Sequence, residues 1–290
     1  MSKLALGTAQ FGLDYGINNT RGKIPQEEIF QILDFACQNG IDMLDTAPAY
    51  GSSQKVIGQY LAARGGKLNV VSKLSKGSFS DVRKAIHNIL AEVNLNTIYG
   101  LIYHSIDDFK ADPDSWKVLE EQKAAGKVNK IGFSLYTADA LEYILEKDIG
   151  FDLVQAPYSV LDRRFEKYFS ILSEKGVEIH VRSVFLQGLV FKAPDELAGH
   201  FLKIKDKLLA LKGLAQKNGL TVASLCLNFA KANKFVGKVV TGVDSLSNLK
   251  ELIGTARDMA QAQALFGAMS DLREEDESII LPFNWTKGMN

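Results

Sequence analysis

Short apolar segments alternate with longer amphipathic segments along the whole chain, and this alternation limits the folds open to it. Eight apolar segments have the length of β-strands: residues 4–8, 41–46, 68–73, 98–105, 128–134, 151–157, 177–183 and 237–243. Their apolar residues are consecutive, as expected for strands that are covered on both faces. Between them lie segments of helical period, of which residues 26–38 and 81–93 are the clearest. Eight strand–helix units predict a parallel sheet, because parallel neighbours need helical crossovers.

Eight is also the number of strands that closes a (β/α)8 barrel, a fold that usually needs about 250 residues. The chain has 290 residues. An open, doubly wound sheet would need a glycine-rich phosphate loop after the first strand, and Gly7–Gly12 does not supply G-x-G-x-x-G. We therefore expect an α/β fold, a (β/α)8 TIM barrel in which residues 1–290 form a single domain. Residues 258–290 are expected to add a helix and a tail that folds over the catalytic mouth.

Charge and cysteine content argue against several classes of protein. The 34 basic and 34 acidic residues give a formal net charge of zero, so we expect no nucleic-acid partner and no attraction to anionic membranes. The chain lacks both a signal peptide pattern and the ~18 to 20 consecutive apolar residues of a membrane span, which favours a cytoplasmic protein. Cys37 and Cys226 lie in apolar helical segments, and we expect both to be buried and reduced.

Ionisable residues end three consecutive strand segments. Asp45 ends the second, Lys73 the third and His104 the fourth, and Tyr50 follows a few residues after Asp45. In a TIM barrel the C-terminal strand ends carry the chemistry, so these side chains should share one rim. Taken singly, each has an ordinary structural role open to it, such as a helix cap or a surface lysine. Their grouping on neighbouring strands favours a catalytic site.

The chemistry of the four side chains fits the reduction of a carbonyl group. A tyrosine has a pKa near ~10, and a nearby ammonium such as Lys73 is expected to lower it and make Tyr50 a general acid. A buried lysine needs a carboxylate partner, and Asp45 is placed to be one. His104 can donate a hydrogen bond to a carbonyl oxygen on which negative charge develops. The hydride must come from elsewhere, which implies a nicotinamide cofactor.

The segment Asp45–Gln54, D-T-A-P-A-Y-G-S-S-Q, resembles the D-T-A-x-x-Y-G-x-S-E segment of the aldo-keto reductase superfamily, with Gln54 in place of the usual glutamate. The resemblance runs through nearly the whole chain. It implies one role for each of the four residues: Tyr50 donates the proton, Lys73 lowers its pKa, Asp45 pairs with Lys73, and His104 orients the carbonyl.

The resemblance also covers the cofactor-binding segments, with some departures. Ser134 and Gln155 match residues that hold the carboxamide of the nicotinamide, but Leu135 replaces an asparagine. Arg182 stands where an aromatic residue usually stacks on the nicotinamide ring, and a guanidinium can also stack on a planar ring. The cofactor-binding residues implied by the resemblance are Gly7, Thr8, Ser134, Gln155, Arg182, Ser183, Phe185, Gly242, Ser245, Asn248 and Glu251.

The choice between NADP(H) and NAD(H) is not decided by these matches. NADP-specific members carry a lysine near Gly242 and an arginine near Asn248 for the 2′-phosphate. Both are absent here, and Asp244 adds a negative charge where a phosphate would need charged donors. The habit of the family still favours NADP(H), with NAD(H) as the other candidate.

The substrate is expected to be a small carbonyl or alcohol. Phe11 and Trp285 are the aromatic residues we expect in its pocket, beside Tyr50 and His104. Arg182 lies close enough to the nicotinamide position to recognise a carboxylate or phosphate on the substrate. The other histidines and the cysteines lack the spacing of metal ligands, so we expect no metal site.

Three functions remain open on the sequence. The first is an NAD(P)(H)-dependent oxidoreductase that acts on aldehydes, ketones or sugars. The second is a cofactor-binding regulatory module of the same fold with little turnover, an idea that Leu135 and Arg182 keep open. The third is an aldolase that uses Lys73 as a Schiff-base nucleophile, which would leave Tyr50 and His104 without a purpose.

Overall fold

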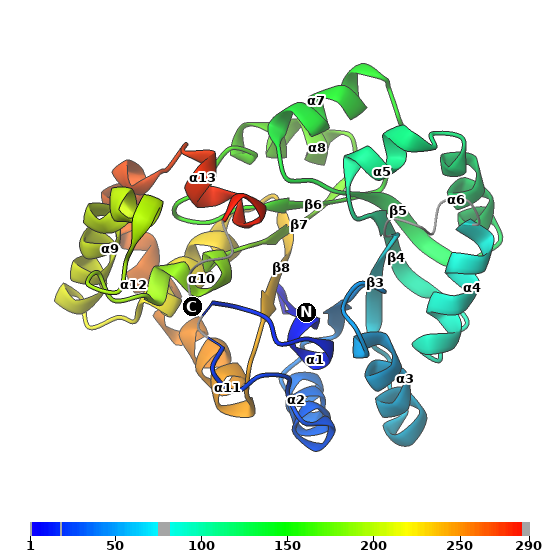
Figure 1. The fold of residues 1–290 in the computed structure, drawn as a ribbon, viewed down its shortest axis with the longest axis horizontal. Coiled ribbons are helices and arrows are strands. Elements are labelled where there is room, and N and C mark those ends of the chain that lie inside the picture. Colours follow the sequence, from blue (N-terminus) through cyan, green and yellow to red (C-terminus); the bar gives the residue numbers. More distant parts are fainter. Residues whose placement is uncertain (1, 18, 75–81, 286–290) are drawn as a thin grey trace.

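Eight parallel strands close into a barrel with the helices on its outside, as the sequence predicts (Figure 1). The computed structural model describes residues 2–17, 19–74 and 82–285. Each strand pairs with its neighbours in chain order, and β8 pairs with β1 to close the ring. The strands are β1 (Leu4–Gly7), β2 (Met43–Asp45), β3 (Asn69–Leu74), β4 (Ile98–Tyr103), β5 (Val128–Ser134), β6 (Leu153–Pro157), β7 (Glu178–Arg182) and β8 (Val236–Gly242).

Helices connect the strands and cover the outer face of the barrel. The α-helices are α1 (Ala9–Gly12), α2 (Gln26–Gln38), α3 (Ser53–Arg64), α4 (Val82–Glu92), α5 (Ile106–Ala111), α6 (Ser115–Ala124), α7 (Ala138–Glu146), α8 (Phe169–Glu174), α9 (Lys205–Lys217), α10 (Val222–Ala232), α11 (Leu246–Gly254), α12 (Met259–Ala264) and α13 (Glu277–Ile280). The 3-10 helices are η2 (Glu166–Tyr168), η3 (Leu186–Phe191), η4 (Gly199–Ile204), η5 (Thr255–Asp258), η6 (Phe266–Leu272) and η7 (Pro282–Asn284). The predicted helix 26–38 is α2. The predicted helix 81–93 corresponds to α4, which ends one residue earlier, at Glu92, and residue 81 lies outside the described residues. None of the described helices has the length and apolar content to cross a bilayer.

Two hydrophobic layers hold the barrel. The larger layer lies between the strands and the surrounding helices. The smaller layer fills the inside of the barrel with one strand residue each from six strands: Ala5, Met43, Val71, Ile102, Leu153 and Val240. Because side chains alternate along a strand, these six strands supply both layers, which explains why their segments are continuously apolar in sequence.

The end of the chain returns to the mouth of the barrel. Phe283 of η7 packs edge-on against the ring of Tyr136, which follows β5, at 5.3 Å between ring centroids. Trp285 packs against Phe201 of η4, and its Nε1 donates to the carbonyl of Ile279 at 2.9 Å. The last five residues of the predicted tail, 286–290, lie outside the described residues.

The two cysteines differ in their surroundings. Both are free, and Cys226 on α10 is buried as expected, but the prediction for Cys37 is wrong because its side chain is exposed. The buried face of α2 consists of Ile29, Ile32, Leu33 and Ala36. One residue further along a helix turns the side chain by about 100°, and this turn carries Cys37 off the buried face.

Gly132 on β5 allows β6 to approach closely. A Cβ at this position would lie 1.7 Å from the carbonyl oxygen of Leu153, so an alanine can fit only if the strands move apart. We predict that Gly132→Ala lowers the free energy of unfolding by about 1–3 kcal/mol or more, because overpacking distorts the backbone. Urea denaturation measures the change. Gly213→Ala on exposed α9 is the control, since nothing lies within 4 Å of its Cβ and a helical alanine should add up to about 1 kcal/mol. Equal stability of the two variants would contradict the prediction.

Candidate active site

The alternation of side chains along the strands brings Asp45, Lys73 and His104 together. Each follows an apolar residue of the barrel interior by two positions, so it points to the same inner side at the C-terminal end. The preceding interior residues are Met43, Val71 and Ile102. The inner face of the barrel is therefore apolar at its centre and ionisable at one mouth.

Lys73 and Asp45 form a buried ion pair. Lys73 Nζ lies 2.6 Å from Asp45 Oδ1 and also donates to the carbonyl of Thr46 at 3.1 Å. The Lys73 side chain is 1% exposed. On the other side of the carboxylate, Gln155 Nε2 of β6 donates to Asp45 Oδ2 at 2.7 Å. Both oxygens of the carboxylate are thus hydrogen-bonded, as a buried charge requires.

Tyr50 is held beside this pair by a close contact between its loop and the end of α1. A Cβ on Gly12 would lie 1.8 Å from the carbonyl oxygen of Tyr50, and Gly51 has a φ of 58°, so both positions need glycine. Lys73 Nζ lies 5.1 Å from the centroid of the Tyr50 ring. The ring of His104 stands edge-on to that of Tyr50 at 6.1 Å between centroids. All four predicted catalytic residues therefore meet at one place.

Burial shifts the pKa values of Tyr50 and His104. The pKa of Tyr50 is raised well above its usual value, first by burial and then by the charge of Asp45. The pKa of Tyr50 is therefore not below its usual value, as was expected from the sequence, because burial and the charge of Asp45 both disfavour the phenolate. Burial, and then the charge of Lys73, lower the pKa of His104 to about 4. Tyr50 is accordingly protonated and His104 neutral near pH 7.

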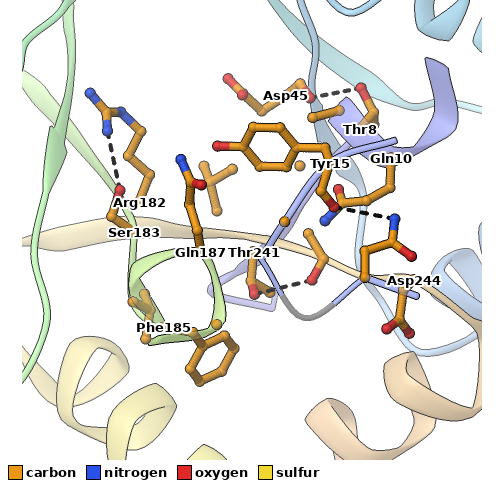
Figure 2. Close-up of a pocket in the computed structure, with 18 of the residues that line it drawn as sticks. Thr8, Gln10, Tyr15, Asp45, Arg182, Ser183, Phe185, Gln187, Thr241 and Asp244 are labelled. Carbon is orange, nitrogen blue, oxygen red and sulfur yellow. Dashed lines mark hydrogen bonds between the residues drawn. The ribbon is translucent and has the colours of Figure 1, made fainter. Parts of the chain in front are cut away.

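A cavity of about 400 Å³ opens at this mouth (Figure 2). It is lined by the four residues predicted to be catalytic and by most residues that the resemblance assigned to the cofactor. Those lining the cavity are Gly7, Thr8, Ser134, Gln155, Arg182, Ser183, Phe185, Gly242, Asn248 and Glu251. The cavity runs from β5, β6 and β7 across β1 to β8 and the start of α11.

Three expected pocket residues lie elsewhere. Phe11 of α1 is completely buried in the hydrophobic core, because its face of this short helix packs inward. Trp285 packs against Phe201 and does not line the cavity. Ser245 is also absent from the lining, since its hydroxyl accepts from the backbone N–H of Asn248 and caps α11.

Thr8 lines the cavity, but its hydroxyl is used inside the protein. It donates to the carbonyl of Asp45 at 2.9 Å and accepts from Ser53 Oγ at 2.7 Å. These bonds tie β1 and the start of α3 to the end of β2, from which Tyr50 follows. Thr8 thus positions the loop of Tyr50.

Two lining residues, Asn19 and Gln187, were not expected from the sequence. Asn19 follows α1, whereas Gln187 lies in η3, after β7. Figure 2 shows the hydroxyl end of Tyr15 and the amide of Gln187 directed to the side of the cavity on which Arg182 lies. The only sequence signals were the nearby glycines, Gly16 and Gly188, which both have positive φ.

The lining also contains polar atoms that suit a nicotinamide carboxamide. Ser134 Oγ and Gln155 Oε1 are buried and have no hydrogen-bond partner within the described residues, although such atoms are normally paired. Ser134 and Gln155 are register partners on β5 and β6, so the two atoms belong to adjacent positions. A carboxamide has both a donor and an acceptor and would satisfy them.

Among the described residues, no group of three or more His, Cys, Asp or Glu side chains is arranged to hold a metal ion.

The first prediction for the site concerns the buried pair. Lys73→Met should lower the free energy of unfolding by about 3–5 kcal/mol, because Asp45 is left as an uncompensated buried charge. Adding Asp45→Asn should recover part of the loss. Urea denaturation of the single and double variants measures both effects. Lys117→Met is the matched control: its pair with Asp114 is fully exposed, so its loss should leave the free energy of unfolding nearly unchanged. A loss at Lys73 no larger than at Lys117 would argue against the pair.

The second prediction concerns His104. Because its pKa is lowered to about 4, the unfolded chain binds this proton at higher pH than the folded one. Stability should therefore fall as the pH drops from about 6.5 toward 4. An NMR titration of the imidazole resonances should place the midpoint of His104 near 4, with His104→Asn used to assign the signal. A midpoint above 6 would contradict a neutral histidine in the cavity.

Comparison with known proteins agrees with the geometry. Residues 3–264 match the Aldo/keto reductase family. Two relatives are the L-galactose dehydrogenase of Arabidopsis thaliana, 23% identical over 93% of this chain and 90% of its own length, and the NADH-specific methylglyoxal reductase of Escherichia coli, 24% identical over 87% and 88%. The fold is similar to that of an aldo-keto reductase from Bacillus halodurans in its holo form. That structure has a TM-score of 0.75 and 20% identity, covering 95% of this chain and 94% of that one. The chain belongs to the aldo/keto reductase family.

Proposed function

We propose that this protein is an NAD(P)(H)-dependent oxidoreductase that reduces an aldehyde or ketone to the alcohol, or catalyses the reverse reaction, with Tyr50 as proton donor. The observation that carries the proposal is the meeting of Tyr50, the Lys73–Asp45 pair and His104 at a cavity whose wall holds the unpaired Ser134 Oγ and Gln155 Oε1. Relatives named as a dehydrogenase and a reductase support the reaction class.

The residues of this chain would share the work as follows. The bound cofactor supplies or accepts the hydride. Tyr50, which is protonated because burial raises its pKa, gives its proton to the carbonyl oxygen. Lys73, near the Tyr50 ring, stabilises the phenolate that remains, and Asp45 holds Lys73 in place. His104 is neutral and donates a hydrogen bond to the same oxygen.

The habit of the family and the lining of the cavity favour different coenzymes. Family habit favours NADP(H), whereas Asp244 and Glu251 line the end formed by β8 and α11 and would repel a 2′-phosphate. Arg21 reaches this end, since its guanidinium donates to the carbonyl of Asp244 at 3.0 Å, but it also forms an ion pair with Glu28. This arrangement favours NAD(H) at least as strongly as NADP(H), and the titration below includes both.

The structure also bears on the other two functions. An aldolase would need a neutral Lys73, but the Asp45 carboxylate at 2.6 Å stabilises the ammonium, which is not a nucleophile. A regulatory module would bind the coenzyme without turnover. The protonated Tyr50 beside a neutral His104 favours catalysis over a purely regulatory role. The titration and turnover experiment below distinguishes the three functions.

The test begins with the fluorescence of NADPH and NADH on titration with the protein. Turnover of a panel of aldehydes is then followed by loss of nucleotide absorbance. Tyr50→Phe should reduce kcat by about 100- to 10,000-fold, because general acid catalysis contributes this much. Coenzyme affinity should change little, since the phenol is not among the groups expected to hold the coenzyme.

Tyr143→Phe on α7 is the control, because Tyr143 packs on the outer layer away from the cavity. Unreduced turnover in Tyr50→Phe would remove Tyr50 from the role of proton donor. Coenzyme binding by the wild type without turnover of any carbonyl would favour the regulatory module. Trapping of a substrate on Lys73 by borohydride would favour the aldolase.

A further inference from the structure

Arg182 lines the catalytic cavity without a carboxylate partner. Its guanidinium donates to two neutral oxygens, Ser183 Oγ at 3.2 Å and the Leu135 carbonyl at 3.0 Å. Among the residues the structure describes, no carboxylate oxygen lies within 4.0 Å of it. Six other arginines do pair with carboxylates at the surface or in the loops: Arg21, Arg64, Arg83, Arg164, Arg257 and Arg273.

The surroundings of Arg182 fix its position and leave donors unused. The guanidinium carbon lies 4.0 Å from the centroid of the Tyr136 ring, so the two planar groups pack together. Two of the five N–H groups of a guanidinium are used by Ser183 and Leu135. The others have no acceptor within the described part of the chain. A fixed, partly buried cation with unused donors is arranged for a planar or tetrahedral anion.

Arg182 also lies within electrostatic reach of the reacting groups. Its charge acts to lower the pKa of both Tyr50 and His104, although the pKa of Tyr50 as a whole is raised by burial. It affects Tyr15 in the same way. Arg182, Tyr50 and His104 also line the same cavity, so one molecule in it can face all three.

The backbone after Arg182 is unusual. Ser183, Leu186 and Gln187 all have positive φ, at 62°, 45° and 52°, and none is a glycine. Such conformations persist where the surrounding structure enforces them, and they gather at binding sites. Here they place Ser183 Oγ on the guanidinium and direct the amide of Gln187 to the same side of the cavity (Figure 2).

We propose that Arg182 recognises an anionic group, a carboxylate or a phosphate, on the carbonyl substrate. The inference rests on the proposed function and deepens it, because it names the class of substrate. Neutral aldehydes would still reach Tyr50 and His104. They would lack the charge-assisted hydrogen bonds that hold an anionic substrate.

The experiment compares matched substrates that differ in one charged group. Succinic semialdehyde is paired with butanal for the carboxylate, and glyceraldehyde 3-phosphate with glyceraldehyde for the phosphate. For each pair, the ratio of kcat/KM, charged over neutral, is measured at saturating coenzyme. In Arg182→Ala at least one ratio should fall by about 10- to 100-fold, and Arg182→Lys should keep an intermediate value. Losses common to both substrates cancel in the ratio.

The controls separate this role from cofactor binding. Arg83→Ala, in an exposed pair on α4, should leave both ratios unchanged. The dissociation constant of the coenzyme is measured for each variant by fluorescence. If Arg182→Ala leaves both ratios at the wild-type value, the proposal is wrong. A weakened coenzyme together with unchanged ratios would assign Arg182 to the cofactor instead.

A binding measurement tests the proposal apart from turnover. Succinate and inorganic phosphate are titrated into the wild type and Arg182→Ala by calorimetry at low salt. Weaker binding of at least one anion by about tenfold in the variant supports the proposal, and equal binding overturns it. If no aldehyde is turned over, the proposed function fails, but this comparison still decides whether Arg182 is an anion site.

Discussion

The buried pair of Lys73 and Asp45 is the interaction on which the mouth of the barrel depends. Two opposite charges lie 2.6 Å apart in a place from which water is nearly excluded, so neither tolerates the loss of the other. Gln155 on β6 donates a hydrogen bond to the second carboxylate oxygen of Asp45, and the Thr8 hydroxyl donates one to the backbone carbonyl of Asp45. The carboxylate of Asp45 therefore links β2 to β3 and β6, and the pair keeps an ammonium close to the Tyr50 ring.

Burial determines the protonation of Tyr50 and His104, the other two residues of the proposed active site. The same exclusion of water that strengthens the ion pair raises the pKa of Tyr50 and lowers that of His104, because it penalises the charged form of each. The result is a tyrosine that keeps its proton and a histidine that stays neutral near pH 7. Beyond them the cavity has a cation, Arg182, on the β7 side and an acid, Asp244, on the β8 side.

The sequence predicted the strands closely because buried parallel strands have continuous apolar segments, and β5, for example, spans the predicted residues 128–134. It also predicted Asp45, Lys73 and His104 as neighbours, since strand order alone puts them on one rim. It did not predict Asn19 or Gln187, because the course of the chain around these residues depends on tertiary contacts. Phe11 and Trp285 were misplaced for a related reason: an aromatic residue near a rim packs inward or outward according to neighbours that no local pattern specifies.

The chain's periodicity by itself determined a closed eight-stranded barrel and the residues that stand at its C-terminal mouth, because alternation along a strand fixes the side on which each residue lies. Only the tertiary structure decided which charged and polar groups pair. It placed Asp45 against Lys73, directed the Gln155 amide to Asp45, and left Arg182 bonded to the Leu135 carbonyl and not to a carboxylate of the described residues. These outcomes depend on distances of a few ångströms between distant parts of the chain, and Coulomb energy and desolvation change steeply over such distances.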